Sequence, residues 1–167
     1  MKINKVTTVF FSPTDLTKKV LMLMAKEFPL KTEEIDIADY AKKDATYQFT
    51  QDELVIIGAP VYGGRAPSPA IQRLEKMRGN NTPAVVVAVF GNRNYDDSLL
   101  ELQNTVEKNG FKVIAAAAVV AEHSIMKSIA AGRPDDEDAQ NIKDFTVKVQ
   151  QKLASTEDIS ALSKLKV

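Results

Sequence analysis

The chain has no cysteine, a single histidine and no excess charge of either sign among its 167 residues. Without cysteine there is no disulfide framework, no thiolate nucleophile and no cysteine-held iron–sulfur cluster. Its 22 basic and 22 acidic residues cancel, so no net field is available to hold a nucleic acid or an anionic membrane. We therefore expect no nucleic acid among the partners.

Long apolar runs are also missing. No segment approaches the roughly 18 apolar residues of a membrane span, and Met1 to Lys5 contains no hydrophobic signal core. We expect a cytoplasmic protein with no membrane span. Apolar residues make up 44% of the chain and charged residues 26%, a balance typical of one soluble domain. That domain is predicted over residues 1–154, with a tail at 155–167 that is either a short docked helix or a frayed end.

Short apolar runs alternate with longer amphipathic segments along the chain. Continuous runs of this kind are typical of parallel strands covered by helices on both faces. Helical spacing of apolar residues follows the first, third, fourth and fifth of them, beginning with Lys18 to Phe28. The predicted strands are Val6 to Phe11, Glu34 to Ile37, Leu54 to Ala59, Ala84 to Phe90 and Phe111 to Val120. The second is short and mixed, which indicates an edge position.

Several helix boundaries carry their own signals. Ser68 before Pro69 predicts an N-cap with proline at the first helical position, and Ser98 with Glu101 predicts a capping box. The acidic group from Asp135 to Asp138 suits the positive end of a last helix. Gly110 is placed where a helix should end before the fifth strand.

This order predicts an α/β fold, a three-layer doubly wound sandwich around a five-stranded parallel sheet. In such sheets ligands bind beyond the carboxyl ends of the strands. That rule selects three loops, at residues 12–17, 60–68 and 91–97. The chain contains no internal repeat and no low-complexity linker.

The first loop reads Ser12-Pro13-Thr14-Asp15-Leu16-Thr17. Three hydroxyls and a row of backbone N–H groups at a strand-to-helix turn favour a phosphate site that needs no lysine. An ordinary Ser/Thr-rich turn with an N-cap is the alternative. A Walker Gly-Lys-Ser/Thr motif and a Gly-x-Gly-x-x-Gly motif are both missing after the first strand, which argues against a P-loop NTPase or a dinucleotide fold.

The other two loops combine glycine with an aromatic ring. Pro60-Val61-Tyr62-Gly63-Gly64 lets the backbone approach a flat ligand while Tyr62 stacks on it. Gly91-Asn92-Arg93-Asn94-Tyr95-Asp96 offers amide groups for the polar edge of a heterocycle and Tyr95 for its face. Each loop has a simpler alternative when it is considered by itself. Tyr62 is then a half-packed surface aromatic, and 91–97 is a plain polar turn.

Together these motifs resemble the flavodoxin-like family, in which a hydroxyl-rich loop holds the FMN phosphate and two further loops meet the flavin. With Glu122-His123-Ser124 and Gly132-Arg133-Pro134, the set is similar to the flavodoxin-like half of bacterial and archaeal proteins fused to a bis-cluster ferredoxin. The match runs from about Val6 to Leu153. The resemblance implies the strand order 2-1-3-4-5 and noncovalent FMN used for electron transfer or flavin-dependent reduction.

The resemblance also implies roles for particular residues. Ser12, Thr14, Leu16 and Thr17 would hold the phosphate, Tyr62 and Tyr95 would flank the isoalloxazine, and the backbone at 61–64 and 91–94 would meet its polar edge. The partner would be a redox protein such as a separate ferredoxin or reductase, because the chain carries no cysteine-bearing segment. A homodimer is a further expectation.

One departure from the family pattern stands in the first loop. Asp15 occupies a position where the family usually has glycine; aspartate tolerates a left-handed turn but adds negative charge beside a dianion. A flavodoxin-like interaction module with weak or lost FMN binding is therefore the alternative function. A phosphoacceptor domain of the response-regulator type is disfavoured, because Gly58-Ala59-Pro60 ends the third strand without an aspartate.

His123 is the candidate proton donor, since histidine alone has an unperturbed pKa near neutrality; a structural hydrogen bond is its alternative role. Arg93 and Arg133 are candidates for contact with phosphate, flavin or a nicotinamide donor. No metal site is predicted, because His123 has no second histidine or cysteine to join it. The acidic group 135–138 is better explained as a helix start.

Overall fold

A computed structural model describes residues 1–167 and contains a main sheet, a small ribbon, four α-helices and two 3-10 turns. The strands are β1 (Lys5–Phe10), β2 (Lys31–Asp36), β3 (Tyr47–Gln48), β4 (Glu53–Pro60), β5 (Met77–Arg78), β6 (Thr82–Phe90) and β7 (Phe111–Val120). The helices are α1 (Leu16–Ala25), α2 (Ser68–Leu74), α3 (Ser98–Lys108) and α4 (Asp136–Ser155), with η1 (Tyr40–Lys42) and η2 (Ile159–Ala161) as 3-10 turns.

The main sheet has five parallel strands in the order β2-β1-β4-β6-β7. Counting only these strands, this is the predicted order 2-1-3-4-5. The second strand lies at an edge, as its mixed sequence indicated, but it begins at Lys31 instead of Glu34. The apolar pattern missed residues 31–33, because β2 is only partly buried and its first residues are polar or charged. β3 and β5 form a separate two-stranded parallel ribbon, which the sequence analysis did not predict.

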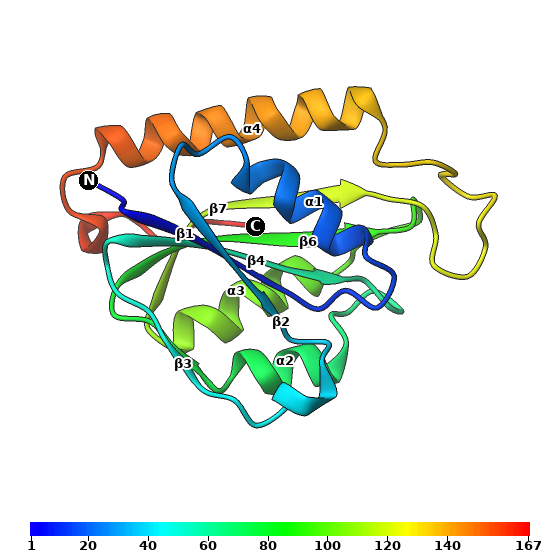
Figure 1. Ribbon diagram of the computed structural model, residues 1–167, viewed down its shortest axis with the longest axis horizontal. Helices are drawn as coiled ribbons and strands as arrows, with labels where there is room; N and C mark the ends of the chain where they lie inside the picture. Colours follow the sequence, from blue (N-terminus) through cyan, green and yellow to red (C-terminus); the bar gives the residue numbers. More distant parts are fainter.

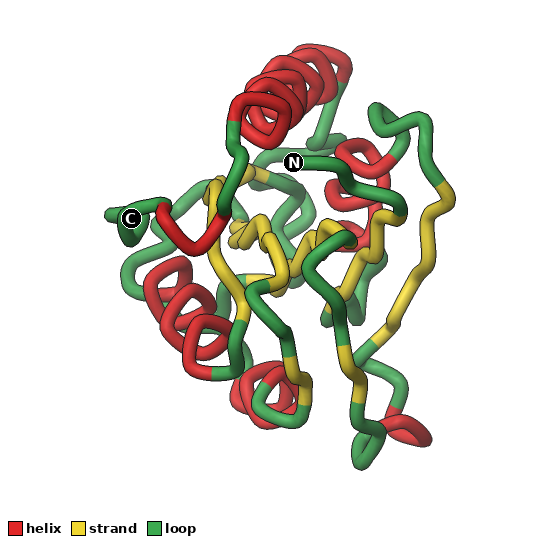
Figure 2. Tube along the Cα trace, turned by 90° about the vertical axis from the view of Figure 1, so that its left-hand side faces the viewer, coloured by secondary structure: helices red, strands yellow, loops and turns green.

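Helices cover both faces of the sheet, α1 and α4 on one side and α2 and α3 on the other (Figure 1). The view turned by 90° shows the same layers from the end of the molecule (Figure 2). Strand residues alternate between the two cores: Val6, Leu54 and Ile56 face the α1/α4 side, whereas Val9 and Val55 belong to the other. Burial on both faces explains why β4 and β6 are continuous apolar runs.

Two predicted helix starts are wrong by a residue. α2 begins at Ser68 itself with Pro67 as its N-cap, so Ser68 does not cap the helix. α3 has Asp97 as its N-cap, without a side-chain cap hydrogen bond. Ser98 Oγ instead donates to the Tyr95 carbonyl at 2.6 Å, and Glu101 is used elsewhere. The sequence matches a capping box, but Ser98 bonds within its own loop and Glu101 bonds Arg65 and Ala66 of the second loop.

The last helix begins as its acidic residues predicted. Asp135 is the N-cap of α4, and its side chain and that of Asp138 accept hydrogen bonds from each other's backbone amides at 2.9 and 3.0 Å. Gly110 follows the end of α3 with φ of 87°, a left-handed conformation that glycine adopts without strain. Beyond α4 the tail forms η2 and buries Ile159 in the α1/α4 core.

None of the helices is both long enough and apolar enough to cross a bilayer.

Candidate functional site

The three predicted loops follow β1, β4 and β6, neighbouring strands whose carboxyl ends lie at one end of the sheet. They enclose a small hollow of about 30 Å³ together with the segment that follows β7. Its lining includes seven predicted site residues: Thr14, Leu16, Thr17, Pro60, Val61, Tyr62 and Gly91. Five further lining residues were not predicted as ligands: Val89, Phe90, Ala121, Glu122 and Ser124. Their position directly at or after strand ends was the available signal.

The first loop presents donors that no group in the protein accepts. α1 begins at Leu16, and the backbone amides of Thr14, Leu16 and Thr17 make no hydrogen bond within the protein. Thr17 is 2% exposed, yet its hydroxyl also has no partner and the residue lines the hollow. Free amides at a helix N-terminus, with the helix dipole behind them, suit an anion.

Ser12 and Asp15 shape this loop. The Lys18 amide donates to Ser12 Oγ at 3.0 Å, so the buried Ser12 closes the turn instead of lining the hollow. Asp15 takes φ of 60° and ψ of −4°, the left-handed turn that its position in the sequence predicted. Its side chain is exposed and makes no cap hydrogen bond. Pro13 is exposed and outside the lining.

The second loop is a tight turn carried by two glycines. Gly63 and Gly64 have φ of 60° and 80°, and Tyr62 and Arg65 exchange backbone hydrogen bonds across the turn at 2.9 and 3.3 Å. Tyr62 is 44% exposed, so one part of its ring is open to a stacking partner. Partial burial raises the pKa of the Tyr62 phenol.

Glu101 on α3 ties this loop to the body of the protein. Its carboxylate accepts hydrogen bonds from Arg65 Nε at 3.1 Å and from the Ala66 amide at 3.0 Å. Arg65 and, to a lesser degree, the Ala66 amide lower the pKa of Glu101 despite its partial burial. The ionised Glu101 carboxylate therefore fixes the carboxyl side of the second loop. The sequence pattern had predicted a different role for Glu101, in a capping box at the start of α3.

The third loop contacts the second. Asn92 and Asp96 adopt φ of 59° and 40°, and Asn94 donates to Asp96 Oδ1 at 2.6 Å while accepting from the Asp96 amide. A Cβ at Gly64 would lie 2.4 Å from Asp96 Oδ2. The absence of a side chain at Gly64 thus allows the two loops to meet. Arg93 is exposed and in no ion pair.

Tyr95 is separated from Tyr62 by its packing. Its ring meets Phe90 edge-on with centroids 5.5 Å apart. Tyr95 lines a different hollow, beside β7 and α4, together with Leu99 and Ile114. The ring is still 39% exposed. The structure thus brings Tyr62 to the hollow between the loops but leaves Tyr95 at its outer side.

The segment after β7 closes the site on the remaining side. His123 Nδ1 accepts hydrogen bonds from the Ile125 and Met126 amides, both at 3.1 Å, which is a structural role. Arg133 forms a two-pronged ion pair with Asp138, so its guanidinium is engaged and not directed to a ligand. The Arg133 hydrogen bond is the main reason that the pKa of Asp138 is lowered. No group of three or more metal-ligating side chains is present.

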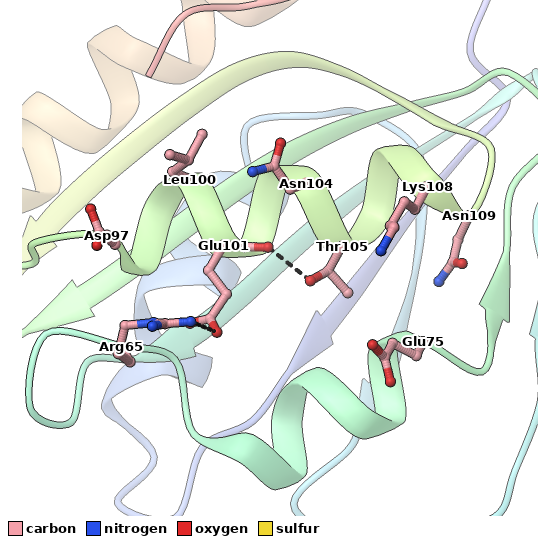
Figure 3. A pocket seen from close by; sticks show the side chains of 9 residues that line it. All are labelled: Arg65, Glu75, Asp97, Leu100, Glu101, Asn104, Thr105, Lys108 and Asn109. Atoms are coloured by element: carbon pink, nitrogen blue, oxygen red, sulfur yellow. Dashed lines mark hydrogen bonds and ion pairs between the residues drawn. The ribbon is translucent and has the colours of Figure 1, made fainter.

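A larger hollow of about 680 Å³ lies between α2 and α3 (Figure 3). It is open and mostly polar, and the figure shows Glu101 reaching across it to Arg65. Its lining comes from the surfaces and ends of α2 and α3 and from Arg65 of the second loop, and no aromatic ring is among them. We therefore assign the candidate site to the smaller hollow at the strand ends, where free donors and the exposed ring of Tyr62 coincide.

No protein-family model and no curated protein matches the chain. Solved structures do resemble it. An NADH:FMN oxidoreductase in its apo form matches with 13% identity and a TM-score of 0.63, over 96% of this chain and 95% of that one. A Fusobacterium nucleatum flavodoxin bound to flavin mononucleotide matches with 13% identity and a TM-score of 0.61, over 90% of this chain and 99% of that one.

The match also extends to part of a longer protein. Rubredoxin oxygen:oxidoreductase of Desulfovibrio gigas is 18% identical with a TM-score of 0.59, over 92% of this chain and 38% of that one. At such identities the similarity establishes architecture. The chain has a flavodoxin-like fold, as the motifs predicted.

Proposed function

We propose that the protein binds FMN noncovalently and uses it for electron transfer or flavin-dependent reduction. The observation that carries this proposal is the unpartnered set of donors at the start of α1, the amides of Thr14, Leu16 and Thr17 and the Thr17 hydroxyl. Such a set fits a phosphate monoester. The proposal is supported by the fold that the chain shares with an NADH:FMN oxidoreductase and an FMN-bound flavodoxin.

The donor chemistry fits FMN, and the size of the hollow limits which part of FMN could enter it. A hollow of about 30 Å³ suits a small polar group but not a three-ring system. The isoalloxazine would therefore lie at the surface between the second and third loops, where Tyr62 presents an exposed ring face. Tyr95 would flank its other side by leaving the edge of Phe90. The two glycines of the second loop provide the freedom to adjust.

The bound flavin would supply the redox chemistry. The chain would contribute binding and orientation: loop 12–17 holds the phosphate, and backbone groups of 60–64 and 91–96 meet the polar edge of the ring. Glu101 keeps the second loop in register through Arg65 and Ala66. His123 would donate a proton only from Nε2, because Nδ1 accepts hydrogen bonds from two backbone amides.

The same proposal includes a redox partner. A separate ferredoxin or reductase would exchange electrons with the flavin, since the chain has no cysteine to hold a cluster of its own. A single domain over residues 1–154 in the cytoplasm is part of this proposal.

The second candidate is a flavodoxin-like interaction module with weak or lost FMN binding. The small size of the hollow and the additional carboxylate of Asp15 favour it. The two candidates differ in one property, saturable binding of the flavin.

A titration separates the two candidates. Purified protein is examined for a visible flavin spectrum, and the flavin-free form is then titrated with FMN and, as a matched ligand without phosphate, with riboflavin. Because charge-assisted hydrogen bonds to the phosphate carry the proposal, FMN should bind about a hundredfold more tightly than riboflavin. A colourless protein without saturable FMN binding contradicts the proposal and supports the interaction module.

A second measurement divides carrier from enzyme. The FMN-loaded protein is mixed with NADH or NADPH and a quinone, and nucleotide oxidation is followed in steady state. Turnover with both reactants indicates a reductase. Slow reaction with both, together with rapid reduction by a partner flavoprotein reductase, indicates a carrier.

A further inference from the structure

The β7 edge of the sheet carries backbone groups that nothing in the protein pairs. The Ala121 amide donates to the Phe90 carbonyl at 2.9 Å, and strand residues alternate in direction. Ala116, Ala118 and Val120 therefore direct their N–H and C=O groups away from β6. β7 is the last strand of the sheet, and no loop or side chain bonds these groups. Only Ile114 is covered, by Lys152 Nζ at 2.7 Å from its carbonyl.

The opposite edge of the sheet is protected. β2 carries Lys31, Glu33, Glu34 and Asp36, and ion pairs hold Glu33 to Lys5 at 3.0 Å and Glu34 to Lys18 at 2.7 Å. Charges on an edge strand discourage pairing with another chain. The free part of β7, residues 115–120, contains only alanine and valine. This edge has none of the charges, prolines or glycines that would oppose pairing.

Apolar hollows continue the edge toward α4. One, of about 360 Å³, lies beside residues 116–120 and Ile142. The other, of about 380 Å³, lies beside residues 114–116, Lys148 and Lys152, and residues 165–167 bound it on the α3 side, short of the free part of the edge beyond residue 116. Phe145 lines both hollows. The edge and the adjoining side of α4 thus form one surface, here called the β7/α4 surface.

The charges of this surface are arranged so that it complements itself. α4 runs in the opposite direction to β7 (Figure 1). Its first turn is acidic, with Asp136, Glu137 and Asp138, whereas Lys148 and Lys152 lie near the amino-terminal half of β7. A two-fold axis perpendicular to the sheet reverses both elements in a second copy. The lysines of one copy then face the acidic turn of the other.

We propose that the chain forms a two-fold dimer in which the free edges of β7 pair antiparallel and join two sheets into one. Ala116, Ala118 and Val120 supply the backbone hydrogen bonds, Phe145 packs near the axis, and the unlike charges of α4 fix the register. The occupant of the β7/α4 surface is a second copy of this chain. The inference depends on no ligand and is independent of the proposed function.

The first test is the association state of the full chain, measured by sedimentation velocity over a concentration series. A dimer with a measurable dissociation constant is expected. Ala118→Pro removes one outward N–H that the monomer does not use and should abolish the dimer. Glu34→Pro removes an outward N–H on the β2 edge and is the matched control, which should stay dimeric. Circular dichroism and thermal unfolding check that each variant is folded.

A charge swap tests the register without disturbing the strand. Lys148→Glu and Glu137→Lys should each raise the dissociation constant about tenfold, because each reversal acts at two symmetric contacts. Their combination should restore it. Lys143→Glu changes an exposed lysine outside both hollows and should have no effect.

A monomer at every concentration overturns the proposal. So does a dimer that survives in folded Ala118→Pro, because its interface must then lie elsewhere. Single reversals that change nothing, or a combination that restores nothing, overturn the two-fold arrangement of α4.

Discussion

The two ends of the main sheet are built differently. At the carboxyl end lie all the positive-φ residues except Asn81 and Gly110, together with two exposed tyrosines and unpartnered amides. At the amino end, Lys5 Nζ lies 3.0 Å from both Glu33 and Glu53, and the Thr50 amide donates to Glu53 at 2.9 Å. Strained backbone and free donors gather where ligands bind in such folds, whereas satisfied ion pairs gather where the chain needs only stability.

This difference implies that stability and cofactor affinity respond to different residues. Substitutions at the amino end should lower the free energy of unfolding and leave FMN binding unchanged. Substitutions at the carboxyl end should change FMN binding, with a smaller effect on the free energy of unfolding. The following four experiments are ordered by the size of the expected effect.

Lys5→Met should lower the free energy of unfolding by about 2 kcal/mol, because the Glu53 carboxylate, whose side chain is 8% exposed, loses its cation. Urea denaturation measures the change. Lys31→Met is the control, since Lys31 is exposed and lies 3.5 Å from Glu33. A Lys5→Met variant that loses FMN affinity in proportion to its stability would contradict the separation of the two ends.

Thr17→Val should weaken FMN binding about tenfold, because it removes an unpartnered hydroxyl from a residue that lines the hollow and keeps the side-chain shape. Stability should change little. Thr146→Val is the matched control: Thr146 is equally buried on a helix, but its hydroxyl donates to the Ile142 carbonyl at 2.8 Å. Equal FMN affinity of Thr17→Val and the original protein would remove Thr17 from the phosphate site.

Acid pH should loosen the second loop before the sheet unfolds. The folded-state pKa of Glu101 lies below its ordinary value, with the Arg65 hydrogen bond as the main cause. The carboxylate therefore stabilises the fold above the ordinary glutamate range, and this contribution is lost as the pH falls through the lowered pKa. Hydrogen exchange of residues 62–66 measures the loosening.

Glu101→Gln serves as the control in this experiment. It should show the loosening already at neutral pH and lower the free energy of unfolding by about 1 kcal/mol. A loop whose exchange has the same pH dependence in both forms would assign its order to other contacts.

Asp15→Gly should tighten FMN binding severalfold, because it removes a negative charge beside the phosphate and keeps a residue that tolerates φ of 60°. Asp15→Asn separates the two contributions, since it removes the charge but keeps the side chain. Equal FMN affinity in all three forms would place the Asp15 carboxylate away from the phosphate.

The parts of the fold that could be predicted were those fixed by local pattern. Continuous apolar runs gave β4, β6 and β7, and the acidic cluster gave the start of α4. The ribbon of β3 and β5 was missed because two-residue strands leave no periodic signal. Ser98 and Glu101 were misassigned because Ser98 turns back to the Tyr95 carbonyl within its own loop, whereas Glu101 reaches Arg65 in a separate segment.

The candidate site divides in the same way. Loop positions followed from topology, so Thr14, Thr17, Tyr62 and Gly91 were placed together correctly. The direction of a side chain depends on tertiary neighbours, which is why the sequence could not show that Phe90 holds Tyr95 at the outer side. The residues after β7, Glu122 to Ser124, were recognised from the sequence as part of a motif. Only the three-dimensional structure shows that Glu122 and Ser124 line the hollow.

The contact between Gly91 and His123 has a consequence for the history of this protein. A Cβ at position 91 would lie 2.7 Å from His123 Cδ2 and 3.0 Å from His123 Cα, so the imidazole and the backbone behind it together occupy the space that a larger residue at 91 would need. The two positions cannot change independently. Among natural variants of this chain, a side chain at 91 should occur together with a smaller residue at 123 and a small shift of the backbone there, and such paired substitutions would record the contact in sequences alone.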